Sequence, residues 1–430
     1  MPTAPAETVR PRPSRVQLNR IVVCPNCWHK FSPDEILWIA SNPNLINDPV
    51  LGTDKPLRFL PTRFNLQGNA IDARGSICDS MACPRCRLKV PRACIETRPI
   101  FLSIAGTPSC GKSFLLASMA SQLRSAFPSK LKISFRDADA SCNVVLNAFE
   151  EQLFYSSKPD VPVRLKKTEE QGDDYAATIL DGSPVNLVSP FLFAVSPMTG
   201  HPNASDPYQY SRVVALYDNA GESFAAGSDS ANNPVTRHLS QSLATFYCYD
   251  PMQDARLRSQ LIGKSDDVQL STQVVSARQE TVLYEVIERI RRLRGMSQSE
   301  KTDRPLMVIV TKYDSWRSLM PDTELNTVDP FVSRGDGLGA IDLRVVREVS
   351  RRTRELLFKS SPDLVAAVES FTNNAWFIPV SATGVPPQTD PVTKITGVKP
   401  ADLKPIWCEV PMLVALALAG AGLVPFVDTK

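Results

Sequence analysis

Eight residues, Gly106 to Ser113, carry the pattern with the clearest chemistry in this sequence. They match G-x-x-x-x-G-K-[ST] at every position and read Gly106-Thr107-Pro108-Ser109-Cys110-Gly111-Lys112-Ser113. Glycines let the backbone wrap closely around an anion with its N–H groups pointing inward. Lys112 would then bridge the β- and γ-phosphates of a nucleotide, and the hydroxyl of Ser113 would bind Mg²⁺.

The residues around this loop favour a phosphate site over a Gly/Ser-rich turn that binds nothing. An apolar run, Ile100 to Ile104, precedes the loop, and a helical pattern, Phe114 to Phe127, follows it. A strand, a glycine-rich turn and a helix in that order form the setting in which this motif binds phosphate. The start of the helix adds the positive end of its dipole.

Four cysteines form two C-x-x-C pairs, Cys24-Pro25-Asn26-Cys27 and Cys83-Pro84-Arg85-Cys86. Each spacing lets one tight turn present two sulfurs, so the two turns together predict a tetrahedral Zn²⁺ site. Four thiolates leave no open position, which indicates a structural role. Residues 28–82 separate the pairs, more than the roughly 15 to 20 residues that are common, so we expect an insertion there.

Other residues near the pairs leave alternatives open. Cys78, Cys94 or His29 could replace a ligand, although we expect the two cysteines to be small apolar fillers and His29 to lie on the surface. A redox role for C-x-x-C would need a thioredoxin-like βαβ pattern, which this region lacks.

A second acidic motif follows the β-branched run Arg212 to Tyr217 and reads Asp218-Asn219-Ala220-Gly221-Glu222. A carboxylate at the end of such a strand reaches Mg²⁺, usually through water. Gly221 would let a backbone N–H approach the γ-phosphate. Glu222 would either accept a proton from the attacking water or be a solvated residue, and both interpretations stay open.

Two further motifs end predicted strands. Thr311-Lys312-Tyr313-Asp314 follows Leu306 to Val310, and Ser381-Ala382 follows Trp376 to Val380. Each motif is common by chance, and a strand-to-helix turn would explain either one. Their order matters, because ligands of open α/β sheets bind at the carboxyl ends of the strands.

Together these motifs resemble those of the Ras-like (TRAFAC) P-loop GTPases. The resemblance implies that Asp314 accepts hydrogen bonds from guanine N1–H and the 2-amino group, and that Lys312 lies across the base. The backbone at Ser381 and Ala382 would meet the guanine carbonyl. Residues 113–217 separate Lys112 from Asp218, far more than in small GTPases, so the switch threonine is hard to assign.

Thr168 is the candidate for that threonine, with Thr178 as its rival and an ordinary loop role as the plain alternative. Lys112, Glu222 and Thr168 are therefore the predicted catalytic residues. The expected activity is Mg²⁺-dependent GTP hydrolysis in a molecular switch. A signalling-type P-loop ATPase with Glu222 as its base is one alternative, and a nucleotide-gated scaffold with negligible turnover is another.

The zinc ribbon placed before these motifs resembles bacterial double-GTPase or GTPase-associated conflict-system proteins. This resemblance implies partner proteins of the same system, a second GTPase among them, and a role in defence against phage. Because the chain has one phosphate loop, it would supply one GTPase of such a pair.

Alternating strands and helices predict an α/β fold, a three-layer P-loop NTPase arrangement around a mostly parallel sheet. We expect a disordered lead at 1–19, a zinc ribbon with an insertion at 20–97 and a Ras-like domain at 98–430. The predicted helices are Asn143–Tyr155, Ser113–Ala126, Gln273–Leu293 and Leu343–Phe358. The predicted strands are Ile100–Ile104, Leu131–Phe135, Phe191–Val195, Val213–Tyr217, Thr245–Tyr249, Met307–Val310 and Trp376–Val380.

The composition and net charge of the chain indicate which classes of binding partner to expect. The chain has 430 residues, 43% hydrophobic and 22% charged, with a net charge of +3. Such a small charge gives no reason to expect nucleic acid. We expect the arginines at 289, 291, 292 and 294 to form a solvated last helical turn.

The sequence also argues against a membrane. The N-terminus has no apolar signal region, and the apolar stretch Val410 to Val427 is interrupted by prolines and glycines. It predicts a buried helix, Met412–Ala419, rather than a membrane anchor. We therefore expect a cytoplasmic protein.

Overall fold

A seven-stranded sheet forms the centre of the computed structural model, which describes residues 18–165, 175–219, 224, 236–271, 278–334, 337–389 and 396–428. Across the sheet the strands are β10 (Ile133–Asp137), β13 (Phe191–Pro197), β14 (Arg212–Asp218), β9 (Arg98–Gly106), β15 (Ala244–Tyr249), β16 (Leu306–Val310) and β19 (Ala375–Pro379). The strands from β14 to β19 run parallel, while β13 is antiparallel to both of its neighbours. Each predicted strand falls in this sheet, which confirms the expected α/β class with a mostly parallel sheet.

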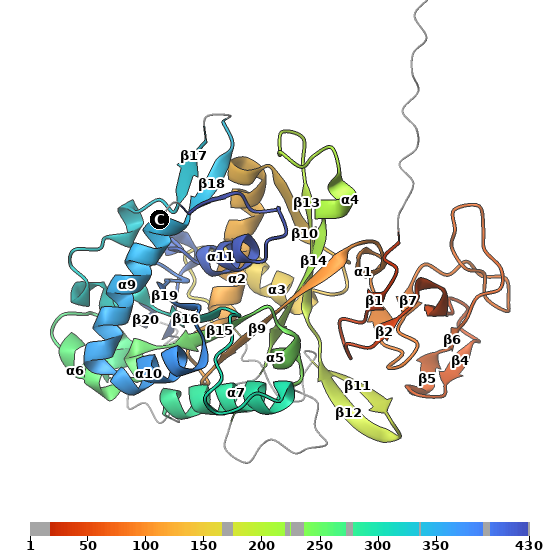
Figure 1. Ribbon diagram of the computed structural model, residues 1–430, viewed down its shortest axis with the longest axis horizontal. Helices are drawn as coiled ribbons and strands as arrows, with labels where there is room; N and C mark the ends of the chain where they lie inside the picture. The colour runs from red at the N-terminus through yellow and green to blue at the C-terminus, as the bar shows by residue number, and fades with distance from the viewer. Residues whose placement is uncertain are drawn as a thin grey trace, which may run out of the picture.

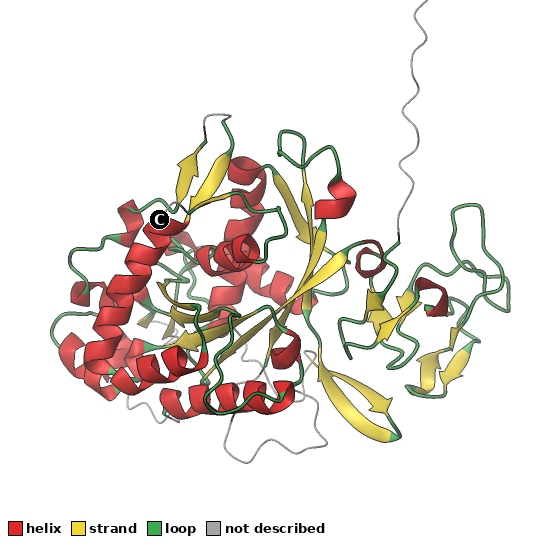
Figure 2. Cartoon of the chain, viewed as in Figure 1, coloured by secondary structure: helices red, strands yellow, loops and turns green. Residues whose placement is uncertain are grey.

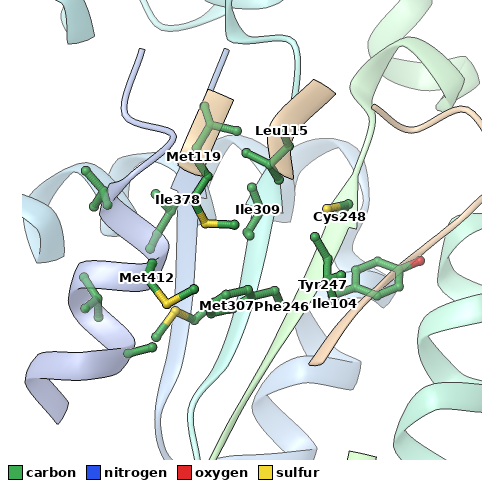
Figure 3. Packing of buried hydrophobic residues seen from close by; sticks show 14 of the residues in the cluster. Ile104, Leu115, Met119, Phe246, Tyr247, Cys248, Met307, Ile309, Ile378 and Met412 are labelled. Carbon is green, nitrogen blue, oxygen red and sulfur yellow. The ribbon is translucent and has the colours of Figure 1, made fainter. Parts of the chain in front are cut away.

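Helices cover both faces of the sheet, since every residue of β15 and of β16 is buried (Figure 2). On one side, α2 (Lys112–Ala126) contacts α3 (Val144–Phe154), and Figure 3 shows Leu115 and Met119 of α2 beside Ile309 of β16. The same view places Met412 of α11 (Val410–Leu418) next to Met307. Elsewhere α7 (Gln279–Arg294) contacts α10 (Pro362–Phe371), which contacts α9 (Leu343–Ser360).

The predicted helices occur with shifted ends. The helix expected to begin at Gln273 begins at Gln279, and residues 272–277 lie outside the described part of the chain. The strand expected from Leu131 begins at Ile133, because Lys132 is left-handed, with a φ of 55°. The helix α10 was not predicted; it follows α9 after the single residue Ser361.

The expectation of a solvated arginine turn at the end of α7 is wrong in part. Arg289 and Arg291 are only 1% and 4% exposed. Arg289 is paired with Glu285 at 2.7 Å and lies 5.5 Å from the ring centroid of Phe224. The aliphatic part of each of these side chains is buried in the protein, and the charged groups make their contacts there and not with solvent.

The C-terminal apolar segment forms the buried helix that was predicted, since α11 is buried from Val410 to Ala417. Within the described residues, no helix combines the length and the apolar character needed to cross a lipid bilayer.

The N-terminal part forms three small sheets beside β14, separate from the central sheet and drawn in red and orange in Figure 1. It contains β1 (Val22–Val23), β2 (Lys30–Phe31), β3 (Leu37–Ile39), β4 (Ile46–Asp48), β5 (Gly52–Pro56), β6 (Arg58–Phe59), β7 (Met81–Ala82), β8 (Lys89–Val90) and α1 (Ala93–Glu96). The strands β2 to β7 lie between the two cysteine pairs, in the segment where we expect the insertion. We call residues 18–97 the ribbon.

Between α3 and β13 lies a hairpin, β11 (Tyr175–Leu180) and β12 (Ser183–Val188). Its two-residue turn has left-handed φ values, 51° at Asp181 and 81° at Gly182, as tight hairpins prefer. Other short elements are α4 (Pro207–Tyr210), α5 (His238–Gln241), α6 (Ala255–Leu261), α8 (Tyr313–Trp316), β17 (Phe331–Ser333), β18 (Gly339–Asp342), β20 (Gln388–Thr389), β21 (Thr396–Gly397) and β22 (Phe426–Val427).

Candidate functional site

The glycine-rich loop, Gly106–Ser113, joins the end of β9 to the start of α2. Gly106 packs tightly against β15, because a Cβ there would lie 2.7 Å from the carbonyl oxygen of Cys248. Gly111 precedes α2 with a left-handed φ of 95°. One glycine thus permits a close approach and the other permits a turn that other residues rarely adopt.

Lys112 places a positive charge over the first turn of this loop. Its Nζ donates to the carbonyl oxygens of Gly106 and Thr107, at 3.0 and 3.3 Å. The side chain is buried, whereas Ser113, the next residue of α2, is half-buried. The ammonium group and the N-terminus of α2 therefore lie together, an arrangement that favours an anion.

Gln253 holds the opposite side of the loop and was not predicted. Its side-chain Oε1 accepts from the hydroxyl of Thr107 at 2.9 Å, and its Nε2 donates to the carbonyl of Pro108 at 3.1 Å. The loop leaves Ser109 exposed and Cys110 buried. Gln253 ends a short helical turn after β15, and its position after that strand was the only sequence signal for it.

Asp218 ends β14 beside the loop. It is in register with Ile104 of the neighbouring parallel strand β9, two residues before Gly106, and is only 6% exposed. Its carboxylate therefore belongs to the same edge of the sheet as Lys112. Three other predicted site residues, Thr168, Gly221 and Glu222, lie outside the described residues.

Thr311 connects the motif after β16 to the glycine-rich loop. Its hydroxyl lies 2.9 Å from the carbonyl oxygen of Cys110 and 3.2 Å from that of Tyr249. Its backbone N–H also donates to the carbonyl oxygen of Tyr249 at 2.9 Å.

The thiol of Cys110, in the glycine-rich loop, has a lowered pKa of about 6. The largest cause is its hydrogen bond with the thiol of Cys248, which outweighs the opposite effect of burial.

Lys312 has a left-handed backbone, with a φ of 58°, and points toward the end of β15. Its Nζ lies 2.6 Å from Oδ2 of the buried Asp250 and 2.7 Å from Oε1 of Gln269. Burial raises the pKa of Asp250, and the attraction of Lys312 only partly offsets it. Asp250 was missed, although its place directly after a predicted strand could have indicated it.

Asp314 and Ser381 meet at the end of the sheet. The hydroxyl of the buried Ser381 donates to Oδ1 of Asp314 and accepts the N–H of Gly384 at 2.7 Å. Ser315 bridges Asp314 and Asp267, with its hydroxyl 3.2 and 2.6 Å from them. Loss of surrounding water raises the pKa of Asp314, and the charge of Asp267 adds to this effect.

The second residue of the serine motif also contacts α2. The carbonyl oxygen of Ala382 accepts from the hydroxyl of Ser118 at 2.7 Å. Direct contacts therefore link the loop, Thr311, Asp314 and Ser381 into one continuous edge. Thr178, the rival switch threonine, lies elsewhere, with its hydroxyl on the carbonyl of Cys86 in the ribbon at 2.7 Å.

The four paired cysteines form one buried cluster. Their sulfur atoms all lie within 4.8 Å of one another, and the Cys24–Cys86 and Cys27–Cys83 distances are both 3.7 Å. A tetrahedral zinc ion with Zn–S bonds of about 2.3 Å requires sulfurs about 3.8 Å apart. The cluster therefore has the ligand set and the dimensions for a metal such as zinc.

The backbone around the cluster repeats the same turn twice. Asn26 N–H points at the sulfur of Cys24 and Arg85 N–H at that of Cys83, each at 3.4 Å. The residue after each pair, Trp28 or Arg87, is left-handed, with φ of 58° and 59°. We call these the first and second cysteine turns. The other nearby cysteines, Cys78 and Cys94, are buried outside the cluster, as expected.

Comparisons with known proteins add little to this geometry. No protein-family model matches the chain, and no curated protein matches it. A crystal structure of a protein from Thermus thermophilus is similar to it at 11% identity and a TM-score of 0.23. The match covers 76% of this chain and 40% of that one. So low a score supports no inference about fold or function.

Proposed function

We propose that the chain is a GTP-binding and GTP-hydrolysing switch of the Ras-like P-loop class, dependent on Mg²⁺ and carrying a structural zinc ribbon. The observation that carries the proposal is the hydrogen bond from Thr311 to Cys110. This bond joins the motif expected to bind the base to the loop expected to bind the phosphates. A nucleotide site requires these two motifs to be in contact, whereas motifs that matched by chance would have no reason to meet.

At the phosphate end, the backbone of the glycine-rich loop would bind the α- and β-phosphates. Lys112 lies within the same loop and would turn from the carbonyls of Gly106 and Thr107 toward the β- and γ-phosphates. Ser113 and Asp218 are the residues that would hold Mg²⁺, which neutralises phosphate charge when bound. Their hydroxyl and carboxylate oxygens are suitable ligands for this ion.

At the base end, the carboxylate of Asp314 would accept from guanine N1–H and the 2-amino group. The hydroxyl of Ser381 holds this carboxylate from one side. Adenine lacks both donors, so bound ATP would leave a carboxylate without its partners, and this cost favours GTP. Lys312, fixed by Asp250 and Gln269, would lie across the base.

Hydrolysis would require two residues that lie outside the described part of the chain. Glu222 would orient or deprotonate the attacking water, and Thr168 would respond to the γ-phosphate. A partner would recognise the GTP-bound form, with proteins of a bacterial conflict system, including a second GTPase, as the expected candidates. The cysteine cluster, having four thiolates, would bind zinc in a structural role.

Competitive binding tests the nucleotide. We expect purified protein with Mg²⁺ to bind GTP at least 100-fold more tightly than ATP. A site built around a buried hydrogen-bonding group rejects an analogue that lacks the partner group by up to about 10⁴- to 10⁵-fold. Equal affinities, together with unchanged GTP binding in Asp314→Asn, would favour a P-loop ATPase instead.

Single-turnover hydrolysis of GTP tests the enzyme. We expect slow turnover in the wild type and roughly 100-fold slower turnover in Glu222→Ala, since a positioned acid or base contributes on the order of 10² or more. Tight GTP binding without hydrolysis in either form, even with cellular partners added, would favour a nucleotide-gated scaffold.

A further inference from the structure

Tyr217 connects the first cysteine turn to the strand that ends in Asp218. Its hydroxyl donates to the carbonyl oxygen of Pro25 at 2.6 Å and accepts from the indole N–H of Trp28 at 3.0 Å. Pro25 lies between the cluster residues Cys24 and Cys27, and Trp28 follows Cys27. The ring is completely buried.

The other side of the Tyr217 ring packs against the structure that supports the glycine-rich loop. It stacks on His238 at a centroid distance of 5.0 Å and an interplanar angle of 15°. The Nδ1 of His238 is 2.5 Å from the hydroxyl of Ser103, which is Tyr217's register partner on β9. Burial lowers the pKa of His238 to about 3, so the imidazole is neutral. Tyr217 thus lies between the ribbon and β9. Its register partner on β9, Ser103, is three residues before Gly106.

The side chains of β14 alternate between two hydrophobic clusters, one shared with the ribbon and one in the main core. Val213, Ala215 and Tyr217 share one face and pack in a single hydrophobic cluster with the four paired cysteines. Val214 and Leu216 belong to the main core on the other face. Because Tyr217 and Asp218 are consecutive residues at the end of β14, both paired with β9, a shift of the backbone at Tyr217 also moves Asp218.

The second cysteine turn is fixed to the body of the protein independently. Arg85 forms a 2.7 Å ion pair with Asp181 in the hairpin turn, and the carbonyl of Cys86 accepts from Thr178. Figure 1 shows the ribbon lying alongside β14 and the base of this hairpin. Both turns therefore contact the sheet domain, so the ribbon is packed against it and is not a tethered appendage.

We propose that Tyr217 is a positioning residue for Asp218 and couples metal binding in the ribbon to binding of Mg²⁺ and nucleotide at the sheet edge. This inference rests on the proposed function. A metal ion fixes the first cysteine turn, the turn fixes the phenol through Pro25 and Trp28, and the phenol fixes the end of β14. Coupling of this kind is reciprocal: the metal strengthens Mg²⁺–nucleotide binding, and Mg²⁺–nucleotide strengthens metal binding by the same factor.

The test compares the affinity of the full chain for a fluorescent, non-hydrolysable GTP analogue before and after a zinc-selective chelator removes the metal. We expect removal to weaken binding about five-fold or more in Mg²⁺, and much less when Mg²⁺ is left out of the buffer, because Asp218 acts through that ion. In Tyr217→Phe, which keeps the ring but loses both hydrogen bonds, the ratio of affinities with and without zinc should approach one. Tyr284→Phe, on the exposed face of α7, is the matched control and should keep the wild-type ratio.

Reciprocity provides a readout that does not use affinity for nucleotide. The affinity for zinc, measured at equilibrium by competition with a chromophoric chelator, should rise about five-fold or more when the analogue and Mg²⁺ are bound to wild type, and should be insensitive to them in Tyr217→Phe. If Tyr217→Phe loses zinc or unfolds, Trp28→Phe removes one of the same hydrogen bonds and carries the test.

The outcomes separate the two proposals. Tight binding of the analogue that is unaffected by zinc, or an unchanged zinc effect in both folded variants, overturns the coupling and leaves the GTPase proposal intact. No binding of guanine nucleotide by zinc-loaded wild type overturns the GTPase proposal and the coupling together.

Discussion

The hydroxyl of Thr311 donates to the carbonyl oxygen of Cys110 over 2.9 Å, although the two residues are 201 positions apart in the chain. This contact ties the end of β16 to the glycine-rich loop at the end of β9. Strand β15 lies between β9 and β16, and the carbonyl of its last residue, Tyr249, accepts a second hydrogen bond from the same hydroxyl. One side chain thus fixes the spacing between the regions proposed to bind phosphates and base.

Asp314→Asn tests recognition of the base. An asparagine has a similar shape but presents an amide where guanine needs a second acceptor, so we expect GTP affinity to fall about 10- to 100-fold, as for one unsatisfied buried group of about 1–3 kcal/mol. Xanthine carries a carbonyl in place of the 2-amino group, so the amide N–H should favour XTP. Competition of GTP and XTP against a fluorescent nucleotide measures both effects. An unchanged preference for GTP would remove Asp314 from the base site.

The pH dependence of binding should follow Asp314. Its pKa is raised by burial and by Asp267, and only the ionised carboxylate accepts both guanine N–H groups. GTP affinity should therefore be greatest above this raised pKa and fall as the pH is lowered through it. Titration of affinity against pH in wild type and Asp314→Asn checks this, and equal pH profiles would contradict it.

The stability of the nucleotide-free protein should show the opposite trend. A raised pKa in the folded state means that Asp314 binds its proton more tightly when folded, so its contribution to stability is lost as the pH rises through that pKa. Asp250 behaves in the same way, so the difference between wild type and Asp314→Asn isolates Asp314. In thermal unfolding, the Asp314→Asn variant should gain stability relative to wild type from acidic to neutral pH.

Gln253→Ala tests the clamp on the glycine-rich loop. Removing the amide leaves the buried hydroxyl of Thr107 without its acceptor, which costs about 1–3 kcal/mol. We expect a lower unfolding temperature and a similar loss of affinity for GDP and GTP, because Gln253 acts on the loop and not on the γ-phosphate. Gln241→Ala, at an exposed position, is the control. A loss confined to GTP would contradict this role.

Cys83→Ser tests the metal centre. Zinc analysis of wild type should give about one equivalent, since four buried thiolates form a closed site. The variant should hold less than about half an equivalent, and limited proteolysis should cut the ribbon first, because binding energy of such sites is folding energy. Cys94→Ala, buried beside the cluster but not part of it, should retain its zinc. Metal-free wild type with reduced cysteines would refute the site.

Much of the sheet was predictable because its strands are short apolar runs that end in polar motifs. β16, for example, is Leu-Met-Val-Ile-Val and stops at Thr311. The two C-x-x-C pairs were equally clear, since a tight turn imposes their spacing. Segments whose conformation depends on distant neighbours were harder, and Arg289 is one case: the sequence suggests a solvated charge, yet packing against Phe224 buries it.

The sequence by itself determined which local units exist: a glycine-rich turn between a strand and a helix, strands ending in Asp218, Thr311 and Ser381, and two cysteine turns. Local backbone preferences and the periodicity of apolar residues are sufficient to encode these. Only the tertiary structure decided that Gln253 clamps the loop, that Lys312 pairs with Asp250, and that Tyr217 lies against the first cysteine turn. Such contacts join residues far apart in sequence, and they arise only when the order of strands in the sheet brings the side chains together.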